Sequence, residues 1–300
     1  MTKPACAPPK KWDQRIERAR ELAHRYSFAT EILTFYSKLA AFQQSFYSRL
    51  QSTLGSEAEC AQNGRLSPEL KPHALESLMP QFRPFLSFLA REGTSELAAL
   101  AATLEKSGAD HWAQILTRFW RRDERDPEGP SEVDEGREPV RPLAGAGPSD
   151  RGLWKFAALA FLRPCVEYLA DRAAIPPPDV RRPVCTFCGS KPLAGVLRPE
   201  GDGAKRSLVC SFCSTEWDYL RIACPACQEC RDERLCVYVA SQFEHVRVEA
   251  CETCRRYIKT VDLTKNGLAI PEVDELAAIP LTLWADERGY AKLSRNIFGS

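Results

Sequence analysis

Four Cys-x-x-Cys pairs lie within about seventy residues of this chain, and they constrain its fold and chemistry more than any other feature. They are Cys185/Cys188, Cys210/Cys213, Cys224/Cys227 and Cys251/Cys254. Ten of the thirteen cysteines fall between the first and the last of these positions. In a reducing compartment, clustered pairs are typical of metal sites rather than of disulfides. Two pairs supply four thiolates, which suit tetrahedral Zn²⁺ or rubredoxin-type iron.

The order in which the pairs combine follows from their spacing. Joining neighbours gives Cys-x2-Cys-x21-Cys-x2-Cys and then Cys-x2-Cys-x23-Cys-x2-Cys, both close to zinc-ribbon spacing. Each joined set encloses a hairpin signal: Gly201-Asp202-Gly203 divides the first, and the Val/Tyr-rich runs 237–239 and 246–248 flank a turn in the second. We therefore favour sequential pairing, while an interleaved arrangement of the first pair with the third stays open.

Three further residues in this region are candidate ligands of lower rank. Cys230 forms an overlapping pair with Cys227, and Cys236 follows it. Because four thiolates already saturate a tetrahedral metal, we interpret both as spare thiols rather than as swapped ligands or redox groups. His245 lies in the second hairpin, and we expect it to be a solvated residue.

The chain upstream of the cysteines has the apolar spacing of α-helices. Apolar residues recur every three or four positions over 12–26 and 32–46, and the pattern continues over 74–92, 95–107, 110–122 and 153–174. We expect the aromatic residues of these segments to form a core rather than a peptide-binding groove. Thr94 is a plausible N-cap. The stretch 123–151 is rich in Pro, Gly and charge, which predicts a mobile loop.

These patterns predict an α+β chain, with a mostly α-helical N-terminal domain followed by two tandem rubredoxin-like or zinc-ribbon-like β modules that carry four-cysteine metal sites. We place the helical domain at 1–178, the modules at 179–220 and 221–265, and a C-terminal helical tail at 266–300. The run Pro176-Pro177-Pro178 marks the boundary before the first module, as a stiff linker would.

Composition and motifs argue against several classes of function. The formal net charge of +1 provides no basic surplus for nucleic acid, no stretch is long and apolar enough to span a membrane, and residues 1–30 have no signal-peptide pattern. We therefore expect a cytoplasmic protein. No phosphate loop, His-Glu-x-x-His or Gly-x-Ser-x-Gly motif is present, and a metal held by four thiolates has no open position for substrate. The sequence does not predict an enzyme.

The order of these features resembles the formate dehydrogenase accessory protein family (FdhE). The resemblance is most specific over Cys185–Lys259, where a Thr-Glu-Trp element follows the second pair. It implies a cytoplasmic maturation factor that binds the catalytic subunit of respiratory formate dehydrogenase before twin-arginine export. It also implies rubredoxin-like iron as the metal, with zinc as the alternative, and it implies no catalytic residue. The extra thiols Cys230 and Cys236 depart from the family pattern.

The resemblance and the residues together leave alternatives open. We expect the metals to fold a docking module for the client, since metal binding supplies much of the folding free energy of small β modules. A one-electron carrier that acts on a cofactor or thiols of the client is the second hypothesis, and a nucleic-acid-binding ribbon is the least favoured. The sequence leaves open whether the chain forms a homodimer.

Overall fold

The computed structural model describes residues 11–53, 61–62, 64–67, 70–121, 151–175 and 180–299. The loop expected at 123–151 lies outside these residues except for Arg151, and so does the linker Pro176–Pro178. Among the described helices, none is long and apolar enough to cross a membrane.

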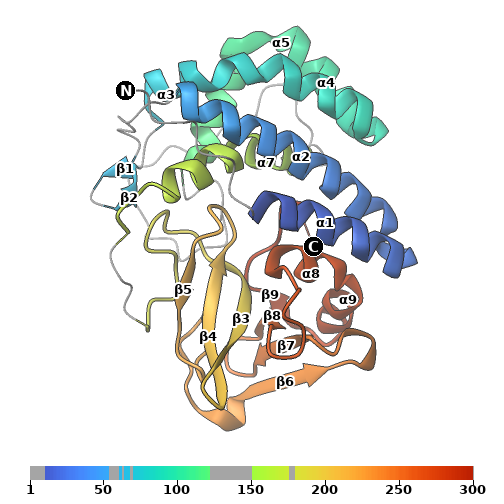
Figure 1. Ribbon diagram of the computed structural model, residues 1–300, viewed down its shortest axis with the longest axis vertical. Coiled ribbons are helices and arrows are strands. Elements are labelled where there is room, and N and C mark those ends of the chain that lie inside the picture. The colour runs from blue at the N-terminus through green and yellow to red at the C-terminus, as the bar shows by residue number, and fades with distance from the viewer. Residues whose placement is uncertain are drawn as a thin grey trace.

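The N-terminal region is helical, as the apolar periodicity predicts (Figure 1). Its helices are α1 Lys11–Arg25, α2 Thr30–Thr53, α3 Pro72–Leu78, α4 Phe82–Glu92, α5 Ser95–Trp120 and α7 Arg151–Ala170, with a short ladder of β1 Ala61–Gln62 and β2 Arg65–Leu66 between α2 and α3. The expected N-cap is confirmed, because Thr94 Oγ1 accepts a hydrogen bond from the Leu97 N–H. The aromatic side chains pack on one another in a core, as expected: Phe85 and Phe161, for example, lie 5.2 Å apart between ring centroids.

The C-terminal region is built on a single seven-stranded sheet. Its strands are β3 Pro192–Glu200, β4 Gly203–Cys210, β5 Glu216–Asp218, β6 Leu235–Val239, β7 Val246–Cys251, β8 Arg256–Asp262 and β9 Ala291–Lys292. The order is β5-β4-β3-β8-β7-β6, with β9 paired to β8. Both expected hairpins are present, as β3–β4 and β6–β7.

A parallel pairing of β3 with β8 joins the two cysteine modules into that sheet, with Gly195 opposite Thr260. The chains approach closely there, because a Cβ added at Gly195 would lie 2.3 Å from Thr260 Oγ1. Glycine inside a strand often marks such an approach. The two predicted modules therefore share backbone hydrogen bonds within one sheet.

The C-terminal residues pack against the sheet. Helices α8 Pro271–Ala277 and α9 Ile279–Glu287 share a core with α1 and with one face of β7 and β8, and in Figure 1 they lie between the sheet and α1. Lys259 of β8 is fully buried under them and donates to the Glu275 carbonyl at 2.6 Å. The segment predicted as a helical tail thus completes a second hydrophobic core, which α1, α8, α9 and the sheet share.

Buried ion pairs tie the helical region to this second core. Arg15 of α1 binds Glu167 of α7 at 3.0 Å and Glu272 of α8 at 2.5 Å. Arg18 binds Asp274 at 2.5 Å. All of these side chains are at least nine-tenths buried. Removing one partner of such a pair leaves an uncompensated buried charge, so these contacts fix how the two regions dock.

Candidate metal centres

Each Cys-x-x-Cys pair forms a tight turn, and the four turns share one backbone conformation. The residue after the second cysteine has a positive φ in every case: Gly189 72°, Ser214 56°, Gln228 61° and Arg255 57°. In three of the turns the N–H of this residue donates to the carbonyl of the first cysteine at 2.9 Å. Non-glycine residues adopt this conformation at a cost of roughly 1–2 kcal/mol, and strained turns of this kind concentrate at functional sites.

The structure brings the pairs together sequentially. Cys185, Cys188, Cys210 and Cys213 form the first cluster, and Cys224, Cys227, Cys251 and Cys254 form the second. Within each cluster all Sγ atoms lie within 4.8 Å of one another. The interleaved arrangement is therefore not the one that this fold adopts.

The sulfur spacing fits a tetrahedral metal. Sγ–Sγ distances across the first cluster are 3.5 Å for Cys185–Cys213 and 3.3 Å for Cys188–Cys210. Both distances measured across the second cluster, Cys224–Cys254 and Cys227–Cys251, are 3.7 Å. A tetrahedron with metal–sulfur bonds of about 2.3 Å places its sulfurs about 3.8 Å apart. Either cluster can therefore hold a metal ion with little movement of its side chains.

Backbone donors are already directed at the sulfurs. The Phe212 N–H donates to Cys210 Sγ at 3.4 Å, and the Ala226 N–H donates to Cys224 Sγ at 3.3 Å. Hydrogen bonds to the charged form of a thiol favour that form. The turns thus provide partial compensation for the negative charge of four thiolates.

Burial acts against the charged form of several of these thiols. Burial raises the pKa of Cys210 and Cys213 well above the ordinary value, and neighbouring thiols add to the shift. Burial likewise raises the pKa of Cys254 to about 11. Burial also acts to raise the pKa of Cys251, but hydrogen bonds with the backbone N–H groups of Cys254 and Thr253 and with the Cys227 and Cys254 thiols together lower this pKa. Because metal binds thiolates, loading either site releases protons.

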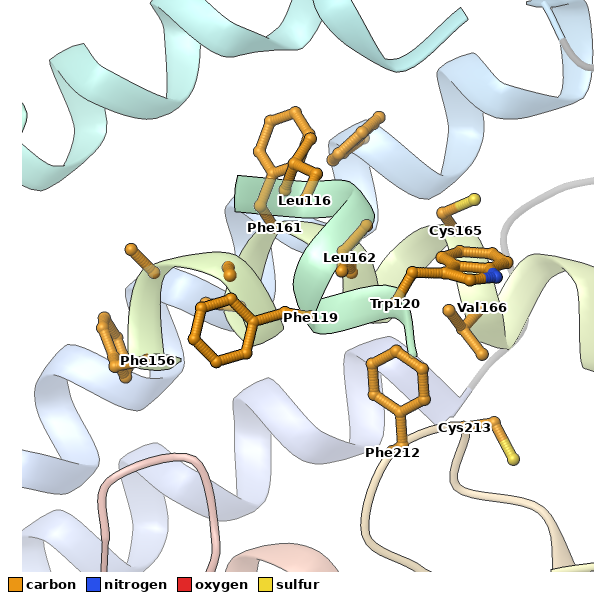
Figure 2. Close-up of a cluster of buried hydrophobic side chains, with 14 of the residues drawn as sticks. Leu116, Phe119, Trp120, Phe156, Phe161, Leu162, Cys165, Val166, Phe212 and Cys213 are labelled. Atoms are coloured by element: carbon orange, nitrogen blue, oxygen red, sulfur yellow. The ribbon is translucent and has the colours of Figure 1, made fainter. Parts of the chain in front are cut away.

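The first cluster lies beneath the helical region. Its loop carries Phe212, which points up toward Trp120 of α5 and Val166 of α7 (Figure 2). Next to Cys213, the Ser214 hydroxyl accepts a hydrogen bond from Arg163 Nη2 at 2.8 Å and donates one to Glu167 Oε1 at 3.0 Å. Helices α5 and α7 therefore position this site directly.

The second cluster lies at the surface. Cys227 is exposed and Cys254 is half-buried, while Cys224 and Cys251 are buried. Its two turns are linked by Thr253 Oγ1, which donates to Glu229 Oε2 at 2.8 Å in an exposed position. The same fold thus holds one enclosed and one open four-cysteine cluster.

The remaining candidate residues have other environments. Cys230 is exposed and donates to the Gln228 carbonyl, Cys236 is half-buried on β6, and neither belongs to the two clusters. The expectation of a solvated His245 is wrong: its side chain is buried, and Nε2 lies 2.7 Å from Asp274 Oδ1. The turn after Phe243 packs against α8, as the contact of His245 with Asp274 shows. The sequence of the hairpin alone does not indicate this contact, because Asp274 of α8 lies 29 residues further along the chain.

Comparison with known proteins places these features in a family. Two family models match adjoining parts of the chain: the FdhE central domain over residues 184–221 and the FdhE C-terminal domain over residues 222–298. The boundary between them lies just before Cys224, where the second cluster begins.

Curated relatives match nearly the whole chain. A protein described as an FdhE homolog from Aquifex aeolicus is 26% identical over 290 residues, which cover 95% of this chain and 94% of the relative. The homolog from Yersinia enterocolitica is 26% identical and covers 96% of this chain and 87% of the relative. The crystal structure of the FdhE protein from Pseudomonas aeruginosa has the same fold, with a TM-score of 0.64, 20% identity, and coverage of 97% of this chain and 96% of that one.

Proposed function

Because this chain belongs to the FdhE family, we propose that it is a cytoplasmic maturation factor that binds the immature catalytic subunit of respiratory formate dehydrogenase before export. Family membership supports a formate dehydrogenase accessory role. The observation that carries the finer proposal is the pair of four-cysteine clusters built into the same sheet. Metal at both sites would hold that sheet in the form the client recognises.

In this proposal the chain is a binding protein and not an enzyme. Each cluster supplies all four ligands of a tetrahedral ion, so that no position stays open to activate water or substrate. Rubredoxin-like iron is the metal we propose, by family resemblance, and Zn²⁺ fits the same sulfurs. When bound, the metal cross-links two turns of the sheet, and the eight cysteines would be its ligands.

The test is an anaerobic pull-down of the full chain from cells that make formate dehydrogenase, with iron and zinc quantified in the eluate. We expect the wild type to recover the catalytic subunit. We expect Cys251→Ser to lose about one metal equivalent and to lose the client, whereas Cys230→Ser, a thiol outside both clusters, keeps both. Client capture at the wild-type level by a Cys251→Ser protein that lacks the metal would contradict the proposal.

The exposure of the second cluster favours one alternative, transfer of a single electron to a cofactor or thiols of the client. Exposed Cys227 places that cluster at the surface, where a redox partner can approach. This alternative requires iron with a reversible change in visible absorbance at a potential within the cellular range. A zinc-only protein that matures formate dehydrogenase at the full rate would exclude it.

A further inference from the structure

The two clusters differ sharply in how far solvent reaches their sulfurs. In the first, Cys185 and Cys210 are 0% exposed, Cys213 is 2% and Cys188 is 8%. In the second, Cys227 is exposed and Cys254 is half-buried. An entering ligand can approach the second cluster from solvent, whereas the first is sealed by the packing of Phe212 under α5 and α7 (Figure 2).

The contacts that hold the two clusters in place also differ in exposure: they are buried at the first cluster and exposed at the second. The first cluster is tied to α7 through buried partners, since Ser214 bonds to Arg163 and Glu167. In the second, the side-chain bond between the turns, Thr253 to Glu229, is exposed to solvent. Exposed polar contacts contribute little to stability, so the turns of the second cluster can separate with less resistance.

A pocket of about 270 Å³ gives a second approach to the open cluster. The two buried thiols of that cluster, Cys224 and Cys251, line it. Its wall also carries four arginines: Arg206, Arg221, Arg247 and Arg256.

Guanidinium groups outnumber carboxylates in this wall. Among the described residues that line the pocket, the carboxylates are those of Asp232 and Glu249, two against four arginines. Glu249 is shared, at 2.6 Å from both Arg206 Nη2 and Arg247 Nη2. The Arg206 side chain is 2% exposed, and its Nη1 also donates to the carbonyls of Leu220 and Ala223 at 2.9 and 3.1 Å. Arg221, by contrast, is exposed, and a guanidinium that solvent reaches favours an anionic occupant.

We propose that the first cluster is a permanent structural site and that the second is an exchangeable metal site, which a small thiol bearing carboxylate groups enters through the arginine-lined pocket. Sulfur is the ligand that such a site prefers, and the carboxylates would face the arginines. In the exchange, the thiolate of the entering molecule takes the ligand position that Cys227 Sγ leaves. Cys227 then takes a proton from solvent, and no electron is transferred. This inference shares one premise with the proposed function, namely that both clusters bind metal, and it does not depend on client binding.

The test uses the full chain loaded with two equivalents of Zn²⁺, verified by metal analysis. Mercaptosuccinate is added as the anionic thiol, and release is followed with a fluorescent zinc indicator. We expect one equivalent to leave at least tenfold faster than the other. Cys227→Ala should lack the fast equivalent and keep the slow one. Release of both equivalents at one rate, or a fast equivalent that persists in Cys227→Ala, would overturn the proposal.

The role of the arginine-lined pocket as the entry route is tested by removing one of its charges and by comparing an anionic thiol with a neutral one. Arg221→Gln should slow the fast phase about threefold or more with mercaptosuccinate and leave it unchanged with neutral 2-mercaptoethanol. Arg20→Gln, an exposed arginine of α1, should change neither rate. Equal slowing with both thiols would reject the pocket as the anion route. A wild-type chain that retains no metal before mixing would instead count against the proposed metal sites, and client capture is measured separately.

Discussion

The side-chain hydroxyl of Ser214 donates a hydrogen bond to Glu167 Oε1 at 3.0 Å, so the turn that follows Cys213 is tied to a fully buried carboxylate of α7. The same carboxylate binds Arg15 Nη1 and Arg163 Nε, each at 3.0 Å. One side chain therefore connects the first cysteine cluster, α7 and α1.

We predict that Glu167→Ala lowers the free energy of unfolding by about 3–5 kcal/mol, because the buried guanidinium of Arg163 loses this carboxylate and that of Arg15 keeps only Glu272. Urea unfolding followed by circular dichroism measures this loss. Asp171→Ala is the matched control directly after the same helix, and since that side chain is 36% exposed, it should cost less than about 1 kcal/mol. Equal losses for the two variants would show that Glu167 is no more important than a surface acid.

The contribution of Glu167 should also depend on pH. Burial acts to raise its pKa, but the charges of Arg15, Lys11 and Arg163 outweigh burial and lower the pKa from 4.5 to about 2. A carboxyl group with a lowered pKa in the folded state stabilises fully above its unfolded pKa, and this stability is lost as the pH falls through the folded value. The difference in unfolding free energy between wild type and Glu167→Gln should therefore be constant above about pH 5 and shrink between pH 4.5 and pH 2. A difference that does not change over this range would contradict the assignment.

The positive φ of the metal turns predicts opposite effects of two substitutions. Gly189→Ala, at φ 72°, should destabilise the first site by about 1 kcal/mol, because a Cβ is unfavourable in this conformation. Gln228→Gly, at φ 61°, should be neutral or stabilising by up to about 1 kcal/mol, because relief of strain exceeds the entropy cost of glycine. Thermal unfolding of the zinc-loaded chain measures both effects. Stabilisation by Gly189→Ala would contradict the shared turn geometry.

Loss of the buried histidine should weaken the joint between the sheet and α8. We predict that His245→Ala lowers the free energy of unfolding by about 1–3 kcal/mol, because Asp274 loses a buried hydrogen-bond partner. His24→Ala, on the exposed face of α1, should change it by less than about 0.5 kcal/mol. Indistinguishable effects of the two variants would show that the contact with Asp274 contributes nothing.

The sequence predicts the two four-cysteine clusters well, because the residues that form each of them lie close together along the chain. A Cys-x-x-Cys turn needs only four residues, and the intervening hairpin brings the next pair to it, as Cys188 and Cys210 show. The helices are predictable for a similar reason, since the apolar spacing of a segment such as 95–107 reports on that segment alone.

The contacts that join the two regions were not predictable, because they connect distant residues. Arg15 and Glu167 are charged residues of helices, a type that is almost never fully buried unless it is paired, yet their side chains are at least 95% buried. Strand β8 was missed because it pairs in parallel with β3, across 65 residues from Ala194 to Lys259. Within β3, Gly195 is the residue that indicates this pairing, because a glycine inside a strand often marks a position where another backbone approaches closely.

The salt bridge from Arg15 to Glu272 spans 257 residues, so the first described helix completes its packing only when nearly the last part of the chain is available. During synthesis, α1 therefore leaves the ribosome long before α8 exists, and the core that includes Ile16 and Leu22 lacks the part that α8 supplies. Contacts so distant along the chain form late in folding. A nascent chain of this protein therefore passes through an interval in which this second core is incomplete.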